Sequence, residues 1–108
     1  MAISHAEKMI PAAVKEAVHS VVPSAELILF GSRARGDFET DSDWDFLVLV
    51  DGDADWELNE RIHDALFEVQ LETGAPVCTV VESRETWDSA YSRATPFHKN
   101  VDKDGRRV

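Results

Sequence analysis

Two aspartates one residue apart, Asp43 and Asp45, stand where a polar segment gives way to an apolar run. Successive side chains of a β-strand point to opposite faces, so both carboxylates project from one face, with Cα atoms about 6–7 Å apart. Upstream, another apolar run ends at the dipeptide Gly31-Ser32. Paired carboxylates bind divalent cations, and a glycine turn lets backbone N–H groups come close to a phosphate. This spacing predicts a site for metal ions and phosphate.

Three short segments bounded by turn residues are predicted to be the β-strands that hold this site. They are residues 26–30, 43–50 and 77–81. The second is apolar at nearly every position after Asp45, which indicates a central strand buried on both faces. Residues 31–36 are expected to form a turn that leads into one short helical turn, so the first two strands can pair antiparallel. A long helix before the third strand indicates a right-handed parallel crossover.

Helical periodicity accounts for much of the remaining chain. Residues 5–22 carry an apolar stripe, and Pro11 is expected in the first turn of the regular part. Residues 54–72 form the clearest helix, with one apolar face and one acidic face. From Ser83, a suitable N-cap, the pattern is helical again until Thr95-Pro96, and a polar tail beyond it is expected to wrap the surface. The predicted fold class is α/β (α+β), with a small mixed three-stranded sheet in the order α-β-α-β-α-β-α and helices packed against it.

Length and composition predict one domain spanning residues 1–108, because 44% hydrophobic and 30% charged residues are typical of soluble globular proteins. No apolar run approaches the roughly 20 residues of a membrane span, and no secretion signal is evident, so we expect a cytoplasmic protein. Cys78 is the single cysteine, which excludes an internal disulfide and a cysteine zinc cluster. The sequence shows no Ser/His/Asp grouping, P-loop or zinc-ligand spacing.

The formal net charge of −10 limits the partners that this chain can bind. Nucleic acid would be repelled by most of such a surface, so direct nucleic-acid binding is not expected. A basic protein partner fits better, as does a small anionic ligand whose charge metal ions bridge. The alternative is that the acidity serves only solubility.

The segment Gly31-Ser32-Arg33-Ala34-Arg35-Gly36, followed by Ser42-Asp43-Trp44-Asp45, resembles the signature of the nucleotidyltransferase superfamily that includes DNA polymerase β. The short chain is similar to the minimal nucleotidyltransferase branch, whose members often partner HEPN-domain toxins. The resemblance covers residues 27–81 and the N-terminal helix. It implies a nucleotidyltransferase fold and a single minimal nucleotidyltransferase domain.

The resemblance also implies roles for individual residues. Asp43 and Asp45 are the expected catalytic residues and ligands of two Mg²⁺ ions, which would lie about 3.5–4 Å apart and clamp the attacking and leaving oxygens. Gly31 and Ser32 are expected to contact the phosphates of ATP or another nucleoside triphosphate, through the backbone and a hydroxyl. Arg33 is the expected source of additional positive charge there, whereas Arg35 is assigned to surface solubility.

The third strand departs from the family pattern. Active members usually carry a third carboxylate on this strand, and here Cys78 occupies that position. A thiol is a poor ligand for Mg²⁺. Glu82 shares the face of Cys78 but lies about 13 Å further along the strand, so it is not expected to replace the missing group. Either the two carboxylates support catalysis together with a different general base, or the site binds nucleotide without efficient turnover. As the alternative to any ligand role, Cys78 is simply a small buried apolar residue.

Three functions remain compatible with these residues. The first is metal-dependent transfer of a nucleoside monophosphate, most readily AMP from ATP, to a hydroxyl on a HEPN-type toxin partner. The second is a catalytically weak nucleotide-binding or antitoxin module that binds a basic partner through the acidic helix 54–72. The third is modification of a small aminoglycoside-like molecule, for which formation of a homo-oligomer could supply the acceptor pocket.

Overall fold

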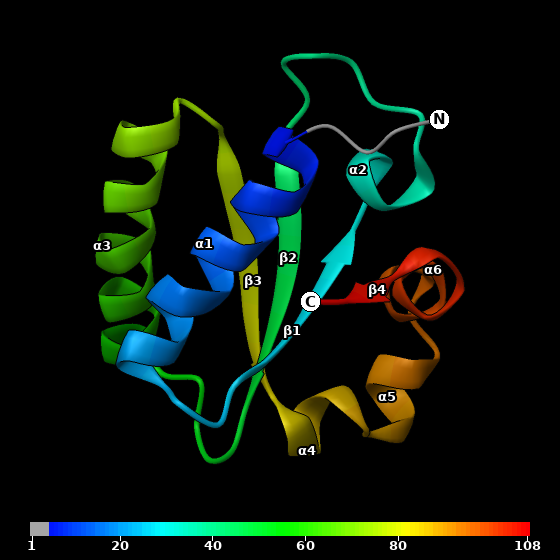
Figure 1. The fold of residues 1–108 in the computed structure, drawn as a ribbon. Coiled ribbons are helices and arrows are strands. Elements are labelled where there is room, and N and C mark those ends of the chain that lie inside the picture. Colours follow the sequence, from blue (N-terminus) through cyan, green and yellow to red (C-terminus); the bar gives the residue numbers. More distant parts are fainter. Residues whose placement is uncertain (1–4) are drawn as a thin grey trace.

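Helices and strands alternate as far as the third strand in the computed structural model, and three helices and a short strand follow (Figure 1). The structure describes residues 5–108, with side chains from residue 8 onwards. The helices are α1 (His5–Val21), α2 (Ser32–Arg35), α3 (Trp56–Thr73), α4 (Arg84–Trp87), α5 (Ala90–Arg93) and α6 (Pro96–Asp104). The strands are β1 (Glu26–Phe30), β2 (Trp44–Val50), β3 (Val77–Ser83) and β4 (Arg106–Arg107). The three predicted strands, the two long helices and the short helix after Gly31 are therefore confirmed.

The strands form one mixed sheet in the order β3-β2-β1-β4. β1 runs antiparallel to β2 and β4, whereas β2 and β3 are parallel and joined by α3. The predicted fold class, antiparallel return and parallel crossover are confirmed. The sheet has one strand more than the three predicted, because Arg106–Arg107 pairs with β1 at its free edge. Two arginines carry no strand pattern, so tertiary pairing alone creates this strand.

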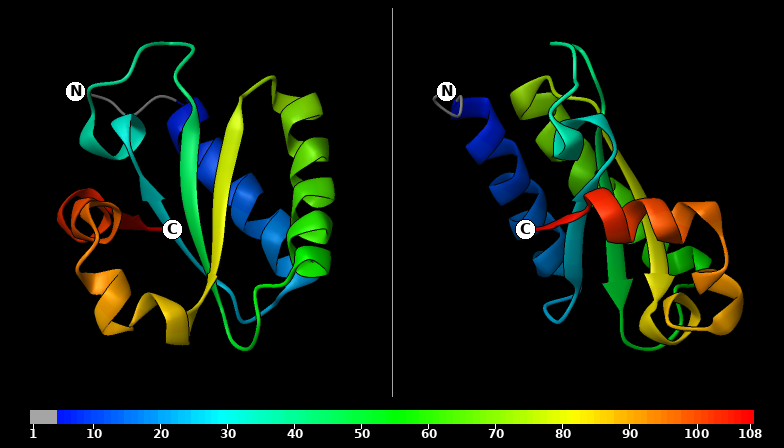
Figure 2. Two further views of the ribbon diagram at one scale, coloured as in Figure 1. Left: turned by 180° about the vertical axis from the view of Figure 1, so that it is seen from behind. Right: turned by 90° about the vertical axis from the view of Figure 1, so that its right-hand side faces the viewer.

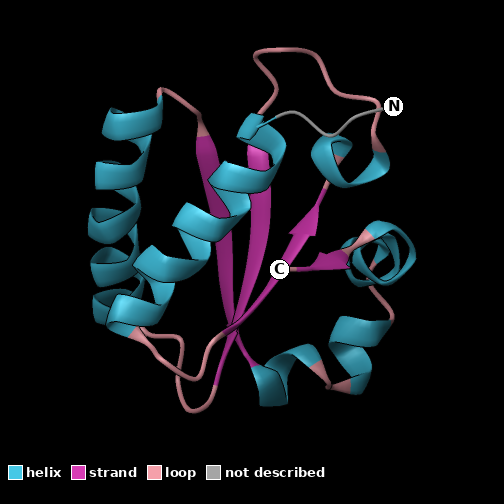
Figure 3. Cartoon of the chain, viewed as in Figure 1, coloured by secondary structure: helices cyan, strands magenta, loops and turns pink. Residues whose placement is uncertain are grey.

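Helices cover both faces of the sheet (Figures 2 and 3). α1 and α3 pack on one face, over the side chains of Phe46 and Val48. On the other face, Leu47 and Leu49 pack against Trp87 of α4 and the Val101 side chain of α6. β2 is thus buried on both sides over most of its length, which confirms its prediction as the central strand.

Two local expectations were wrong. Pro11 lies inside α1, which begins at His5, instead of starting the regular part of the helix. The polar tail does not simply wrap the surface: Thr95 caps α6 by accepting a hydrogen bond from the N–H of His98, and the amphipathic helix then buries Val101. Ser83 caps α4 as predicted. No helix in the described part of the chain combines the length and apolar character needed to cross a membrane.

Candidate active site

Gly31 occupies the turn between β1 and α2, directly beside Asp45. Its φ of 74° and ψ of −159° lie in a region that is essentially restricted to glycine. Antiparallel pairing places Phe30 opposite Asp45, so the chain turns just beyond this carboxylate. A Cβ atom on Gly31 would lie 2.5 Å from Oδ2 of Asp45. Glycine is therefore required both by the backbone conformation and by the close approach to the carboxylate.

Three potential ligand side chains meet at this end of the sheet. Single ligand atoms of Asp43, Asp45 and Cys78 all lie within 4.8 Å of one another. The parallel register pairs Asp45 with Cys78, which places the two side chains on the same face of adjacent strands. The thiol of Cys78 donates a hydrogen bond of 3.7 Å to Oδ2 of Asp43. The predicted proximity of the two carboxylates is confirmed, and their roles in catalysis and metal binding stay predictions.

Cys78 is not the buried apolar residue considered as one alternative. It is solvent-exposed, as is Asp43, whereas Asp45 is half-buried. Glu82 lies four residues further along β3, opposite Leu49, and is not a member of the cluster. The expectation that Glu82 does not replace the missing carboxylate therefore agrees with the geometry.

Negative charge accumulates in the cluster. Burial, and secondarily the neighbouring Asp43 carboxylate, raises the pKa of Asp45, while Arg35 acts in the opposite direction. Partial burial also raises the pKa of the Cys78 thiol, and both aspartates contribute to this increase. Each shift favours the neutral form of its group, so a bound cation would relieve a repulsion that the chain itself leaves.

The donor atoms fit a divalent cation through the two carboxylates of Asp43 and Asp45. Carboxylate oxygens are the ligands that Mg²⁺ prefers, and the backbone of Gly31 comes close to the carboxylate of Asp45. The third donor, the sulfur of Cys78, does not match the preference of Mg²⁺ for oxygen.

Arg33 makes contacts that its predicted role did not anticipate. Its guanidinium lies over the rings of Phe38 and Trp44, at 4.2 and 4.4 Å from the ring centroids. Nη2 donates hydrogen bonds to the backbone carbonyls of Thr40 and Ser42, at 3.1 and 3.2 Å. A phosphate contact by Arg33 stays a prediction, and these contacts favour a role in holding the loop before β2.

Arg35, which the sequence assigned to solubility, is the arginine whose charge acts on the cluster. Its positive charge opposes the increase in the pKa of Asp45. The Arg35 side chain is half-exposed and forms an ion pair of 3.1 Å with Asp37. The sequence favoured Arg33 over Arg35, but both lie within one helical turn, and only the folded structure shows which charge acts on Asp45.

A Ser/His/Asp grouping that the sequence did not reveal lies on α5 and α6. Nδ1 of His98 is 2.9 Å from Oγ of Ser92, and Nε2 of His98 is 3.3 Å from Oδ2 of Asp102. His98 also stacks on Trp87, with ring centroids 3.9 Å apart. Ser92 and His98 are both buried, so this hydroxyl is not presented to a substrate. The grouping fixes the packing of the C-terminal helices instead of forming a second catalytic site.

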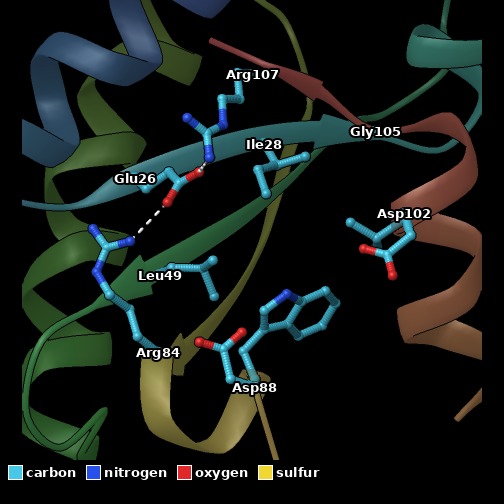
Figure 4. A pocket seen from close by; sticks show the side chains of 10 residues that line it. Glu26, Ile28, Leu49, Arg84, Asp88, Asp102, Gly105 and Arg107 are labelled. Carbon is cyan, nitrogen blue, oxygen red and sulfur yellow. Dashed lines mark hydrogen bonds and ion pairs between the residues drawn. The ribbon is translucent and has the colours of Figure 1, made fainter. Parts of the chain in front are cut away.

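A hollow of about 430 Å³ opens near the other end of β1 and β2 (Figure 4). Its charged side chains are largely paired with one another. The Glu26 carboxylate forms ion pairs with Arg84, at 2.7 Å, and with Arg107, at 2.9 Å. Leu49, which lines the hollow, lies four residues beyond Asp45 along β2. This hollow is therefore separate from the carboxylate cluster.

The fold and the paired carboxylates define a class of protein that can now be named. The family described as nucleotidyltransferase domain matches residues 12–108. The chain therefore belongs to this family and is a nucleotidyltransferase, as the sequence resemblance predicted.

One curated relative supports the same family, and two solved structures share the fold. The chain is 36% identical over 81 residues to the "Putative protein adenylyltransferase MJ0604" of Methanocaldococcus jannaschii, an alignment covering 75% of this chain and 74% of that protein. The fold is similar to that in "Crystal structure of the toxin-antitoxin with AMP-PNP", with a TM-score of 0.63, 16% identity and coverage of 89% of this chain and 69% of the other. It is also similar to "Crystal structure of putative nucleotidyltransferase", with a TM-score of 0.53, 20% identity and coverage of 91% and 96%.

Proposed function

We propose that this chain transfers AMP from ATP to a hydroxyl group on a protein partner. The observation that carries the proposal is the meeting of Asp43 and Asp45 at the glycine turn, where the backbone of Gly31 comes close to Asp45. A protein acceptor is supported by the adenylyltransferase name of the 36% identical relative. By resemblance, a HEPN-type toxin is the partner to test first, and the cytoplasm is the expected compartment.

In the proposed reaction, the acceptor hydroxyl oxygen forms a bond to the α-phosphorus of ATP. The bond between this phosphorus and the oxygen that bridges to the β-phosphorus breaks, so AMP joins the acceptor and pyrophosphate leaves. Asp43 and Asp45 would hold divalent cations, which, when bound, offset the charge of the phosphate oxygens. The backbone at Gly31 and the hydroxyl of Ser32 would bind the phosphates.

The acceptor proton needs a destination other than a third carboxylate. Within the described residues, the third member of the cluster is Cys78, not an acid. The hydroxyl proton therefore passes to water, which reaches the exposed side chains of Asp43 and Cys78.

The test uses Mg²⁺, ATP labelled at the α-phosphate, and a purified HEPN-type protein as the candidate acceptor. Label should move to the partner, and Asp43→Ala should abolish the transfer. Asp53→Ala provides the matched control, because this exposed aspartate lies beyond the opposite end of β2. Transfer undiminished in Asp43→Ala would overturn the assignment. Label found on an added aminoglycoside, without the protein partner, would instead establish the small-molecule alternative.

A second candidate function, neutralisation of a basic partner by binding alone, is favoured by the exposed surface of α3. Trp56, Phe67 and Leu71 are 78%, 58% and 67% exposed, although they are large apolar residues. Exposed acidic residues lie on the same helix: Glu57, Glu60, Asp64, Glu68 and Glu72. Exposed apolar side chains with acidic neighbours fit a partner surface that offers both apolar contacts and basic groups.

Charge reversals distinguish binding from catalysis. Glu60→Lys with Asp64→Lys should weaken partner binding at least tenfold and increase the sensitivity of binding to salt. Asp53→Lys with Glu85→Lys changes the net charge equally at exposed positions outside α3 and should have a smaller effect. Asp43→Ala should leave neutralisation intact if binding alone suffices. Equal effects of the two double variants would mean that net charge, not the α3 surface, governs association.

A further inference from the structure

We propose that Cys78 acts as a third ligand that makes the carboxylate pair prefer thiophilic divalent cations, such as Zn²⁺ and Cd²⁺, over Mg²⁺. The inference deepens the proposed function, because it concerns regulation of the same site. Zn²⁺ held by three protein ligands would displace the Mg²⁺ that accompanies ATP and so inhibit nucleotide transfer.

The spacing of the donor atoms fits such an ion. Zinc binds sulfur at about 2.3 Å and carboxylate oxygen at about 2.0 Å, so a tetrahedral centre separates a sulfur from an oxygen ligand by about 3.5 Å. The observed separation between Sγ of Cys78 and Oδ2 of Asp43 is 3.7 Å. All three ligand atoms, including that of Asp45, lie within 4.8 Å of one another. The sulfur and the Asp43 oxygen are therefore already close to the separation of a tetrahedral site, and the remaining contacts would shorten on binding.

The backbone fixes the direction from which the sulfur reaches the cluster. Parallel pairing of β2 and β3 places Cys78 next to Asp45. On the other side of Asp45, the carboxylate packs against the backbone of Gly31, where a Cβ atom would lie 2.5 Å from Oδ2. Exposure of Cys78 and Asp43 leaves the fourth position open to water or to a phosphate oxygen.

The chemistry of the donors then determines which cation binds more tightly. Mg²⁺ requires octahedral oxygen coordination and gains little from sulfur, so it uses only the two carboxylates. Zn²⁺ and Cd²⁺ accept both oxygen and sulfur and so gain a third protein ligand. A carboxylate at position 78 would weaken this preference.

Cadmium provides a direct probe, because a bond between Cd²⁺ and a thiolate has a characteristic ultraviolet charge-transfer absorption. Cys78 is the only cysteine in the chain, so the signal reports one position. The wild-type protein should develop the absorption on titration with Cd²⁺, and Cys78→Ser should not. Asp43→Asn should weaken Cd²⁺ binding at least tenfold while leaving the thiol in place. Circular dichroism establishes that each variant is folded.

Calorimetric titration with Zn²⁺ and Mg²⁺ completes the comparison. The wild-type protein should bind Zn²⁺ at least a hundredfold more tightly than Mg²⁺. Cys78→Asp should lower the Zn²⁺ preference and increase the Mg²⁺ affinity. The proposal is wrong if the absorption is absent in the wild-type protein, or if Asp43→Asn leaves the Cd²⁺ affinity unchanged, since the thiol would then bind without the carboxylates.

A separate titration with ATP and Mg²⁺ keeps this proposal distinct from the proposed function. Cadmium binding that depends on both Cys78 and Asp43, without any binding of ATP, would support the metal site and contradict nucleotide transfer. Binding and transfer of nucleotide without the cadmium absorption would support the proposed function and contradict the metal site that includes Cys78.

Discussion

The guanidinium of Arg33 donates hydrogen bonds to the backbone carbonyl oxygen of Ser42, at 3.4 Å from Nε and 3.2 Å from Nη2. Ser42 directly precedes Asp43, and Arg33 lies on α2, immediately after the glycine turn. The two pieces of the candidate site are thereby joined through one side chain. The aromatic rings of Phe38 and Trp44 hold this side chain in place.

Replacing Arg33 by lysine is expected to loosen the start of β2 without removing a metal ligand. Lysine keeps the charge but loses the planar group that stacks on two rings and donates to two carbonyls. We expect the rate of nucleotide transfer to fall by about 10- to 100-fold, since small displacements of catalytic groups have effects of this size. Steady-state kinetics and Mn²⁺ affinity measure this effect. A change confined to the KM for ATP would instead indicate the predicted phosphate contact.

Gly31→Ala tests the approach of the glycine turn to the carboxylate. The new methyl group must displace Asp45, and the backbone conformation itself costs about 1–3 kcal/mol for a residue with a side chain. We expect loss of metal binding together with reduced stability, measured by calorimetry and urea denaturation. Gly36→Ala is the matched control: its φ is also positive, at 88°, but nothing lies within 4 Å of the new atom. Equal loss of metal binding in both variants would mean that strain in the turn, and not contact with Asp45, is responsible.

The central part of the fold could be predicted because its signals are local. Apolar runs ending at Gly31 and beginning after Asp45 define two adjacent strands, and the alternation of side chains places Asp43 and Asp45 on one face. Hydrophobic patterning and strand geometry were sufficient for these conclusions. The position of Cys78 came instead from the resemblance to the family, whose active members usually carry a third carboxylate on this strand.

Features that depend on tertiary contacts could not be predicted from the sequence. Arg106–Arg107 becomes a strand only because β1 has a free edge. The difference between Arg33 and Arg35 depends on how the following loop folds back over one of them. Helical spacing places His98 and Asp102 on one side of α6, but the position of Ser92 depends on the packing of α5.

His98→Leu is expected to destabilise the C-terminal helices without affecting the chemistry. The substitution removes the partner of the buried Ser92 hydroxyl, which should cost about 1–3 kcal/mol of the free energy of unfolding. Urea denaturation measures this loss, and adding Ser92→Ala should recover part of it, because no unpaired hydroxyl then remains. Nucleotide transfer well below the melting temperature should be unchanged. A specific loss of transfer in a fully folded variant would give the Ser92–His98 pair a catalytic role.

Asp45→Asn is expected to stabilise the protein in the absence of metal, in a manner that depends on pH. Burial and the Asp43 carboxylate raise the pKa of Asp45, so the folded state holds this proton more tightly than the unfolded state does. Ionisation therefore costs stability, which is lost as the pH rises through the folded pKa. With a chelator present, the variant should melt at a higher temperature than the wild-type protein at neutral pH. Below the ordinary pKa of aspartate the difference should disappear.

Two comparisons separate this effect from a general loss of charge. Asp53→Asn removes one negative charge from an exposed position outside the cluster and should change the melting temperature less. Saturating divalent cation should reverse the order of stability, because only the wild-type protein retains both carboxylate ligands. If Asp45→Asn is less stable than the wild-type protein at every pH without metal, favourable contacts hold the ionised carboxylate in the folded protein. The cluster would then need no cation to offset its charge.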